Sequence, residues 1–386
     1  MGDAYIVAAV RTAGGRRNGK LSKWHPADLG AEVLNAIVER SGIDPSVIDD
    51  VIVGCVTQAG EQAFAFARNV VLASSLPQSV PAVTIDRQCG SSQQAVQFAA
   101  QAVMSGVQDV VIASGVESMS RVPMFSNMSF HEKAGIGIGP FSQRIKDRFH
   151  VGTFSQFAGA EMLAAKYGYE RQTLDYFALK SHQRAAHAVN TGAFTEEIIG
   201  LATEDGIHTI DEGIRFDASL EAIGSVNPLK EGGIVTAANA SQVCDGASGV
   251  LVVNERALKQ YNLTPIARIV DMTVTAGDPV IMLEEPIFAT RKALKKSGMN
   301  ITDIDLYEVN EAFAPMPLAW LEAIEADPER LNVNGGAIAL GHPLGASGTK
   351  LMTTLIHALK ARGKRYGLQT MCEGGGVSNV TILEVF

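Results

Sequence analysis

The chain carries a weak copy of its first part in its last part, and this duplication limits the folds open to it. Residues 6–14 resemble residues 269–277, with five of the nine positions identical at an offset of 263. Farther along, three short matches share an offset of 256, namely Ser41-Gly42 with Ser297-Gly298, Ile48-Asp49 with Ile304-Asp305, and Cys89-Gly90-Ser91 with Gly345-Ala346-Ser347. If the second copy gains one more residue, so that the offset becomes 257, residues 110–113 align with residues 367–370. Their common order and nearly constant offset indicate two related halves.

Each half alternates strands and helices. Residues 51–53 and 110–113 are short, β-branched runs bounded by turn residues, which favours strands. Residues 29–40 and 94–104 carry apolar residues at helical spacing. This alternation predicts an α/β fold of layered sheets with helices outside and between them. Residues 119–247 match neither copy and read as an insertion that covers or completes a site, as long insertions usually do. We therefore expect an N-terminal half (1–118 and 248–266), an inserted loop domain (119–247) and a C-terminal half (267–386).

Composition excludes several classes of protein. With 386 residues, 46% hydrophobic and 19% charged, the chain is globular and long enough for a large core. A net charge of −9 argues against nucleic acid or an anionic membrane as the main partner, so a phosphate-bearing substrate needs a local basic patch. The four cysteines show no paired metal-ligand spacing and suggest a reducing compartment. No apolar run approaches the roughly 20 residues that span a bilayer, and the expected location is the cytoplasm.

Cys89 stands at the start of a predicted helix, followed by the small residues Gly90, Ser91 and Ser92. The unpaired N–H groups and the positive end of the helix dipole favour a thiolate there, and the thiolate is the nucleophilic form. A buried, inert cysteine is the competing interpretation. The segment alone leaves the two open.

Three further residues carry candidate chemistry. His342 lies in a Gly-rich loop three residues before the position that matches Cys89, so a pseudo-twofold relation of the halves brings its imidazole near the thiol. Cys372 precedes three glycines whose backbone N–H groups can face a ligand and stabilise an oxyanion. Asn310 closes a predicted strand and can cap a helix or hold a water. A helix-capping or core role remains open for His342, and burial before a tight turn remains open for Cys372.

Together these segments resemble the four signature blocks of the thiolase family, in family order and at both ends of the chain. The blocks are Cys89-Gly90-Ser91, Asn310-Glu311-Ala312-Phe313, Gly341-His342-Pro343 and Cys372-Glu373-Gly374-Gly375-Gly376. The resemblance implies a five-layer α-β-α-β-α sandwich of two duplicated halves with an inserted loop domain. One departure is Glu373, which places a carboxylate beside Cys372 where many relatives have a small or apolar residue.

The resemblance also implies roles for single residues. Cys89 is the acylated nucleophile, His342 the base that activates it, Asn310 the holder of an oxyanion-hole water and Cys372 the second acid/base. The backbone N–H groups of Cys89 and Gly374 form the oxyanion hole of the acyl-enzyme. Residues that resemble the family's CoA-binding positions are His150, Arg215, Ser241 and Ala312.

The implied reaction is thiolysis of a 3-ketoacyl-CoA to acetyl-CoA and a shortened acyl-CoA, as in fatty acid β-oxidation. CoA is a substrate, no cofactor is tightly bound, and a homodimer or homotetramer is expected, with a hydratase–dehydrogenase complex as a candidate partner. The close alternative is an acetyltransferase that makes acetoacetyl-CoA. A ketoacyl synthase usually has two histidines where this chain has His342 and Cys372. A non-catalytic acyl-CoA- or lipid-binding protein and a metal site are weaker alternatives, the latter because paired ligands are lacking.

Overall fold

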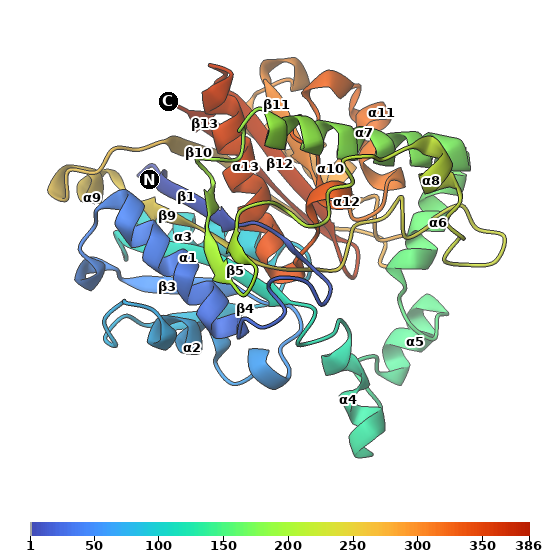
Figure 1. Cartoon of the computed structure of the whole chain (residues 1–386), viewed down its shortest axis with the longest axis horizontal. Helices are drawn as coiled ribbons and strands as arrows, with labels where there is room; N and C mark the ends of the chain where they lie inside the picture. Colours follow the sequence, from blue (N-terminus) through green and yellow to red (C-terminus); the bar gives the residue numbers. More distant parts are fainter. Residues whose placement is uncertain (1) are drawn as a thin grey trace.

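The computed structural model describes residues 2–386. Most of its strands form one mixed sheet in two halves (Figure 1), and two short strands of the insertion form a separate pair. The strand order is β11-β12-β13-β10-β1-β9-β5-β3-β4. In the first half the strands are β1 (Tyr5–Thr12), β3 (Asp50–Gly54), β4 (Ala82–Ile85), β5 (Val110–Ser118) and β9 (Cys244–Val253). In the second half they are β10 (Ala267–Ala276), β11 (Leu306–Val309), β12 (Tyr366–Glu373) and β13 (Val377–Val385). The two halves meet where β1 pairs with β10 through only two residue pairs, Tyr5 with Arg268 and Ile6 with Ala267.

Helices form the other layers. The helix α3 (Ser91–Ser105) packs against α13 (Ser347–Ala361), and both contact strands of the two sheet halves, so they make the central layer. Outside the first half lie α1 (Pro26–Ser41) and α2 (Phe66–Ala73), and outside the second lie α10 (Glu285–Ser297) and α11 (Pro315–Ile324). The predicted order α-β-α-β-α is confirmed.

The duplication extends to hydrogen bonds. Asp49 Oδ2 accepts from the backbone N–H groups of Asp109 and Val110 at 2.7 and 3.0 Å. Asp305 Oδ2 accepts in the same way from Arg365 and Tyr366, at 3.0 and 2.9 Å. All three residues of the second set lie 256 positions after those of the first.

Caps and irregularities repeat as well. Helices α1 and α10 both end on a serine followed by a left-handed glycine, Gly42 and Gly298, with φ of 67° and 71°. Strands β1 and β10 shift register at matching places, after Ile6 and after Ile269. The predicted gain of one residue before residues 367–370 is wrong. Val51 on β3 pairs with Ile112 on β5, and Tyr307 on β11 pairs with Leu368 on β12, so the offset stays at 256. Strands β5 and β12 begin at equivalent turns, each bound by an aspartate, which leaves no room for an extra residue.

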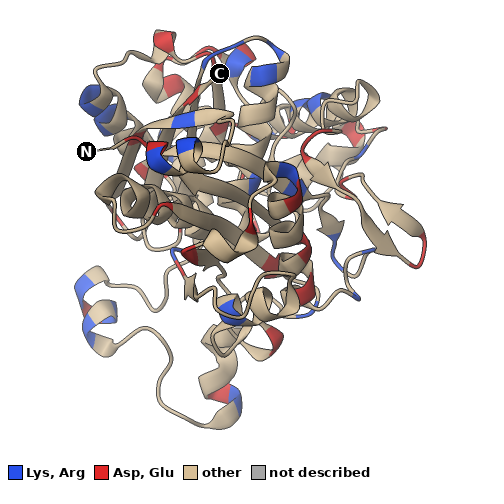
Figure 2. Ribbon diagram, turned by 90° about the vertical axis from the view of Figure 1, so that its left-hand side faces the viewer, with Lys and Arg blue, Asp and Glu red and all other residues tan. Residues whose placement is uncertain are grey.

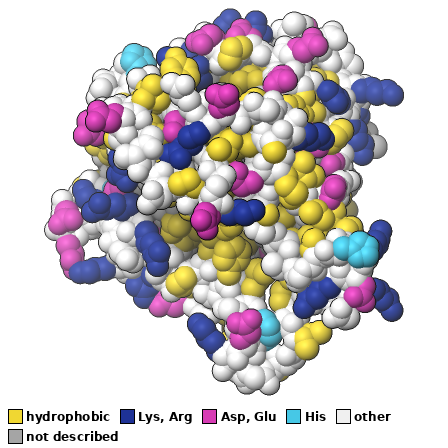
Figure 3. All heavy atoms as spheres, turned by 90° about the vertical axis from the view of Figure 1, so that its right-hand side faces the viewer, with side chains coloured by type: hydrophobic (Ala, Val, Ile, Leu, Met, Phe, Trp, Pro, Cys, Tyr) yellow, Lys and Arg dark blue, Asp and Glu magenta, His cyan; other side chains and the backbone are white. Residues whose placement is uncertain are grey.

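Between β5 and β9 the chain forms the segment that matches neither copy. Its elements are α4 (Ser126–Ala134), α5 (Gln143–Phe149), α6 (Gln156–Tyr167), α7 (Arg171–Asn190), β6 (Ile198–Ile199), β7 (Leu201–Thr203), β8 (Gly206–His208) and α8 (Leu220–Gly224). Helices α4 and α5 protrude from the body (Figure 1), and Lys and Arg residues occur along these protruding helices (Figure 2). On the face shown in Figure 3, hydrophobic side chains gather around a hollow above the protruding lobe.

The remaining elements are β2 (Gly15–Arg16), α9 (Glu255–Gln260) and α12 (Ala337–Leu340). Among residues 2–386, no helix combines the length and apolar character that crossing a bilayer requires.

Candidate active site

Cys89 lies directly before Gly90, the N-terminal cap of α3, where the sequence predicted a helix to begin. The loop from β4 turns through Gln88, whose φ is 49°, and leaves the Cys89 side chain 7% exposed. The thiol belongs to a small apolar cluster whose other buried members are Val56, Met119, Leu344, Leu351 and Met371. We call these residues, with the partly buried Met124 and Val243 that pack on them, the methionine cluster.

Cys372 is buried near the end of β12. It lies near enough to Cys89 for its charged form to raise the pKa of that thiol. After β12 the chain turns through Gly374, Gly375 and Gly376, the last two with φ of 85° and 74°, a region that favours glycine. A Cβ atom at Gly374 would lie 2.8 Å from Gln88 Oε1, so this turn approaches the Cys89 loop closely. The segments of Cys372 and Gly374 therefore adjoin that of Cys89.

His342 and Asn310 form a directed hydrogen-bond chain. Asn310 Nδ2 lies 3.3 Å from His342 Nε2, and His342 Nδ1 lies 2.5 Å from Ser347 Oγ, which donates to the carbonyl of Pro343 at 2.9 Å. With the amide donating to Nε2, the ring proton sits on Nδ1. The backbone N–H of Asn310 donates to the carbonyl of Thr370 at 3.1 Å, which fixes this pair beside the end of β12.

The two central helices bring these segments together. Thr349 N donates to Ser92 Oγ at 3.0 Å, and a Cβ atom at Gly348 would lie 2.0 Å from Gln93 N. The first turns of α3 and α13 are thus in backbone contact. Leu344, two residues after His342, lies in the methionine cluster with Cys89. The pseudo-symmetry predicted this approach of the two loops.

The electrostatics of the thiol differ from the sequence-based expectation. Burial, followed by the nearness of Cys372 and Glu373, raises the pKa of Cys89 well above its ordinary value. Burial likewise raises the pKa of Cys372 to about 12. Burial and the positive charge of Lys350 lower the pKa of His342 to about 3. At this buried position, loss of solvation outweighs the effect of the helix terminus, so the resting groups are a thiol and a neutral imidazole.

Two buried carboxylates that the sequence analysis did not single out hold the loops. Glu117 accepts from the backbone N–H groups of Val56, Thr57 and Gly345 at 2.9, 3.0 and 2.9 Å, which joins the first half to the His342 loop. Glu311 accepts from Ser181 Oγ at 2.6 Å and from the backbone N–H of Ile338 at 3.1 Å. In the sequence, the only sign of such a role for Glu117 or Glu311 was a polar residue at the end of a predicted buried strand.

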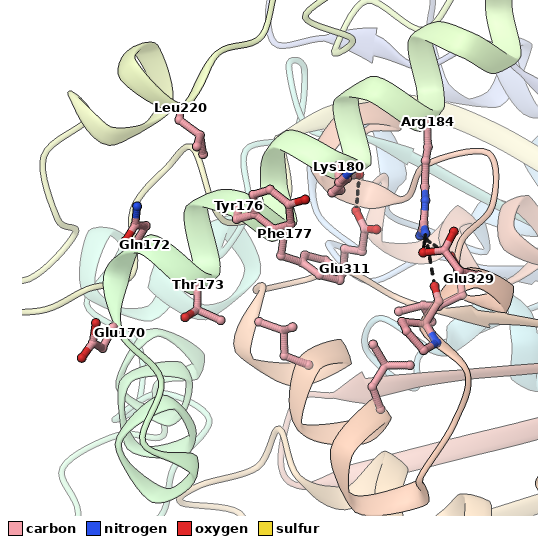
Figure 4. Close-up of a pocket in the computed structure, with 15 residues that line it drawn as sticks. Glu170, Gln172, Thr173, Tyr176, Phe177, Lys180, Arg184, Leu220, Glu311 and Glu329 are labelled. Atoms are coloured by element: carbon pink, nitrogen blue, oxygen red, sulfur yellow. Dashed lines mark hydrogen bonds and ion pairs between the residues drawn. The ribbon is translucent and has the colours of Figure 1, made fainter.

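Glu311 also lies at the edge of a groove of about 560 Å³ between α7 and α11 (Figure 4). In this view Arg184 reaches down from α7 toward Glu329, and Glu311 points up toward α7. None of the predicted site residues lines this groove.

A second buried network supports His342. Lys350 Nζ donates to the carbonyl of Leu340 and lies 3.4 Å from Asp211 Oδ1. Asp211 also receives Arg11 Nη1 at 2.9 Å, and Arg11 Nε contacts Glu197 at 2.5 Å. One carboxylate thereby joins β1, the insertion and α13.

The predicted CoA-binding residues fall into two groups. Ser241 N donates to the carbonyl of Ala312 at 2.9 Å, and the neighbouring Gln242 carbonyl accepts from His342 N at 3.1 Å, so the end of the insertion reaches the site. His150 ends α5 in a left-handed conformation and Arg215 follows the Asp211 turn, and both are exposed on the insertion. Among residues 2–386, no group of three His, Cys, Asp or Glu side chains is placed to hold a metal ion.

Comparison with known proteins gives a consistent result. The family model for the thiolase N-terminal domain matches residues 4–256, and that for the thiolase C-terminal domain matches residues 263–385. The chain is 52% identical to the steroid 3-ketoacyl-CoA thiolase FadA6 of Mycobacterium tuberculosis, over the whole chain and 94% of that protein. It is 40% identical to a probable acetyl-CoA acetyltransferase of Escherichia coli, over 97% of each.

Among solved structures, the acetyl-CoA acetyltransferase of Bacillus anthracis superposes with a TM-score of 0.91 at 34% identity, covering 100% of this chain and 99% of that one. The two matched domains span nearly the whole chain and coincide with its two related halves. The chain therefore belongs to the thiolase family of acyltransferases.

Proposed function

We propose that this protein catalyses the CoA-dependent cleavage of a 3-ketoacyl-CoA to acetyl-CoA and a shortened acyl-CoA through an acyl-enzyme on Cys89. The observation that carries the proposal is the convergence of Cys89, Cys372 and the His342–Asn310 pair where the first turns of α3 and α13 meet. Covalent catalysis through a thioester divides one difficult cleavage into two acyl transfers.

In the first half-reaction, Cys89 Sγ attacks the 3-keto carbon while its proton passes to His342 Nε2. The bond between C2 and C3 then breaks, and its electron pair takes a proton from Cys372 to give acetyl-CoA. In the second, Cys372 recovers a proton from the thiol of incoming CoA, which attacks the thioester. The Cys89 thiolate leaves and takes back the proton held by His342. Protons move in both steps, so two acid/base groups are needed.

The resting proton positions suit this sequence. His342 Nε2 carries no proton and accepts only the 3.3 Å hydrogen bond from Asn310, so it can take the Cys89 proton in place of that bond; once protonated, it becomes a donor to the developing oxyanion. The buried Oδ1 atom of Asn310 has no hydrogen-bond partner among residues 2–386, so the amide retains capacity for a water. The raised pKa of Cys89 and the lowered pKa of His342 disfavour a thiolate–imidazolium pair in the resting protein.

The methionine cluster supports an apolar acyl group next to Cys89. Three of its members are methionines, whose flexible side chains adapt to different shapes. The Mycobacterium tuberculosis relative is named as a thiolase of steroid 3-ketoacyl-CoA, and we propose that this chain also accepts a bulky acyl group. For the phosphates of CoA, α5 offers Arg144, Lys146 and Arg148 in the turn before His150, a local basic patch on an acidic protein.

The second candidate is synthesis of acetoacetyl-CoA from two acetyl-CoA molecules, favoured by the relatives named acetyl-CoA acetyltransferase. The same groups run the reaction in reverse. Initial rates of thiolysis across 3-ketoacyl-CoA substrates of increasing length and ring bulk separate the two. An enzyme dedicated to acetoacetyl-CoA should lose activity as the acyl group becomes longer or bulkier.

We also propose that the protein is a homodimer or homotetramer in the cytoplasm, supplied with 3-ketoacyl-CoA by enzymes that hydrate and then oxidise an enoyl-CoA. The edge strand β4, with Val83 45% exposed, leaves unpaired backbone groups that a second copy can cover. Light scattering measures the oligomeric state.

Intact mass spectrometry tests the nucleophile directly. After addition of acetyl-CoA, the wild-type chain should gain one acetyl group and Cys89→Ala should gain none. Cys55→Ala is the matched control, because Cys55 is also a buried cysteine but lies outside the methionine cluster. Acetylation of the Cys89→Ala variant at the wild-type rate would exclude the proposal.

A further inference from the structure

The Glu373 carboxyl lies under the nucleophile loop with no bonding partner. Its side chain is fully buried, and neither carboxyl oxygen has a hydrogen-bond partner among residues 2–386. A Cβ atom at Gly90 would lie 2.0 Å from Glu373 Oε1 and 2.5 Å from its Cδ, so the carboxyl group packs directly on Gly90. Asn379 Nδ2 donates to the Gly90 carbonyl at 3.3 Å. The residue after Cys89 is held between these two side chains.

Several other buried carboxyls in this fold are bound within residues 2–386, whereas Glu308 on β11 is not. Glu117 and Glu311 each accept several hydrogen bonds, and Glu197 contacts Arg11. Arg87 and the backbone N–H of Asn379 lower the pKa of Glu373, but Arg87 forms no ion pair with it and the N–H group lies outside hydrogen-bond geometry. Arg87 Nε is itself buried without a partner. A carboxyl left unpaired in this way is stable as the neutral acid, since ionisation in a dry site is costly.

Three acidic groups therefore share one buried space. Burial and Cys372 are the two largest causes of the raised pKa of Cys89, and Glu373 is the third. Glu373 also raises the pKa of Cys372, by less than burial does. The other charged groups that face this space are Arg87, which favours the carboxylate, and Asp86, which opposes the Cys89 thiolate. Like charges at such sites ionise one at a time.

We propose that Glu373 is a positioning residue whose neutral carboxyl supports Gly90 and permits the Cys89 thiolate, and whose ionised form repels that thiolate. The proposal rests on Cys89 as the nucleophile. Burial raises the pKa of Glu373 to about 8 against the attraction of Arg87, which places the change in the mildly alkaline range. As the pH rises past that value, Cys89 in the wild-type protein should become less reactive than Cys89 in a variant with a neutral residue at position 373.

The test is the rate at which iodoacetamide alkylates Cys89 between pH 6.5 and 9.5, followed by peptide mass spectrometry in wild type and in Glu373→Gln. At pH 6.5 both proteins carry a neutral group at position 373 and should react at equal rates. By pH 9 the variant should react roughly tenfold faster, because one nearby like charge has been removed. This pH-dependent ratio is a signature that a purely structural role does not produce.

Glu308→Gln is the matched control. Glu308 is a buried carboxyl in the neighbouring strand β11, its pKa is also raised well above its ordinary value by burial, and it does not act on Cys89. Its ratio to wild type should stay near one at every pH. A constant ratio for Glu373→Gln, or an equal effect of Glu308→Gln, would overturn the proposal.

Arg87→Gln provides an independent arm if Glu373→Gln does not fold. Loss of the cation should raise the pKa of Glu373. The pH above which the alkylation rate of Cys89 rises less steeply should therefore be higher in Arg87→Gln than in wild type, and an unchanged pH would count against the proposal. Alkylation needs no substrate turnover, so a protein that fails to form an acetyl-enzyme but shows the predicted ratio would refute the proposed function and leave this inference standing.

Discussion

Arg11 is the clearest place to test what holds the three parts of the chain together. Its guanidinium is fully buried on β1, 2.9 Å from Asp211 and 2.5 Å from Glu197, both of which are fully buried in the insertion. It also lies 4.8 Å from the centre of the Phe194 ring. Arg11→Met keeps much of the apolar stem and removes the charge, so it leaves Glu197 without its cation and Asp211 with only Lys350.

Removing one partner of a buried ion pair costs about 3–5 kcal/mol, because an uncompensated charge remains in the interior. An unfolding entropy of about 2.1 cal/mol/K per residue over 386 residues is about 0.8 kcal/mol/K. Division gives a fall in melting temperature of about 4–6 °C.

Thermal unfolding followed by circular dichroism at pH 7.5 measures this shift. The control is Lys23→Met, which breaks the surface pair with Glu204, where the side chains are 73% and 75% exposed. An exposed pair contributes under about 1 kcal/mol, so this variant should melt within about 1 °C of wild type. If Arg11→Met melts as close to wild type as Lys23→Met, the buried network does not stabilise the fold as argued.

Three more perturbations have defined outcomes. Gly348→Ala places a Cβ 2.0 Å from Gln93 N, so the central helices must separate, and we expect a fall of about 2–3 kcal/mol in urea-unfolding stability together with slower acetylation. Ser347→Ala removes the acceptor of the His342 Nδ1 proton and should lower kcat about tenfold with little change in KM; a change confined to KM would contradict this role. Because the pKa of His342 is lowered to about 3 in the folded protein, the unfolded chain binds a proton first as the pH falls. Stability contributed by the neutral ring is thus present above pH 6.5 and is lost between pH 6.5 and 3, and His342→Asn should show a shallower fall in urea midpoint over that range.

The repeat predicted much of the architecture because it preserves local signals. The Ser41-Gly42 and Ser297-Gly298 pairs mark real helix ends, since only a left-handed cap residue fits there. The match of Cys89 with Gly345 also placed the His342 loop opposite the thiol, because related helices in a duplicated fold start at equivalent points.

Long-range electrostatics could not be predicted in this way. The helix terminus was visible from the sequence, whereas the burial that raises the pKa of Cys89 depends on packing from both halves. Glu117 and Glu373 look alike in sequence, each being a carboxylate at a strand end. Glu117 accepts three backbone hydrogen bonds, whereas Glu373 has no hydrogen-bond partner among residues 2–386, and that difference arises only when distant loops assemble.

The narrow seam between β1 and β10 has a consequence for how the gene product can be divided. Only two residue pairs join the sheet halves there, and the chain crosses between them through residues 261–266, which lie at or near the surface. Cohesion depends instead on the side chains of α3 and α13 and on the Asp211 network. Two polypeptides cut in that crossing are each inert, since neither holds a complete set of reacting groups, yet mixing them should reconstitute a working enzyme without a covalent link.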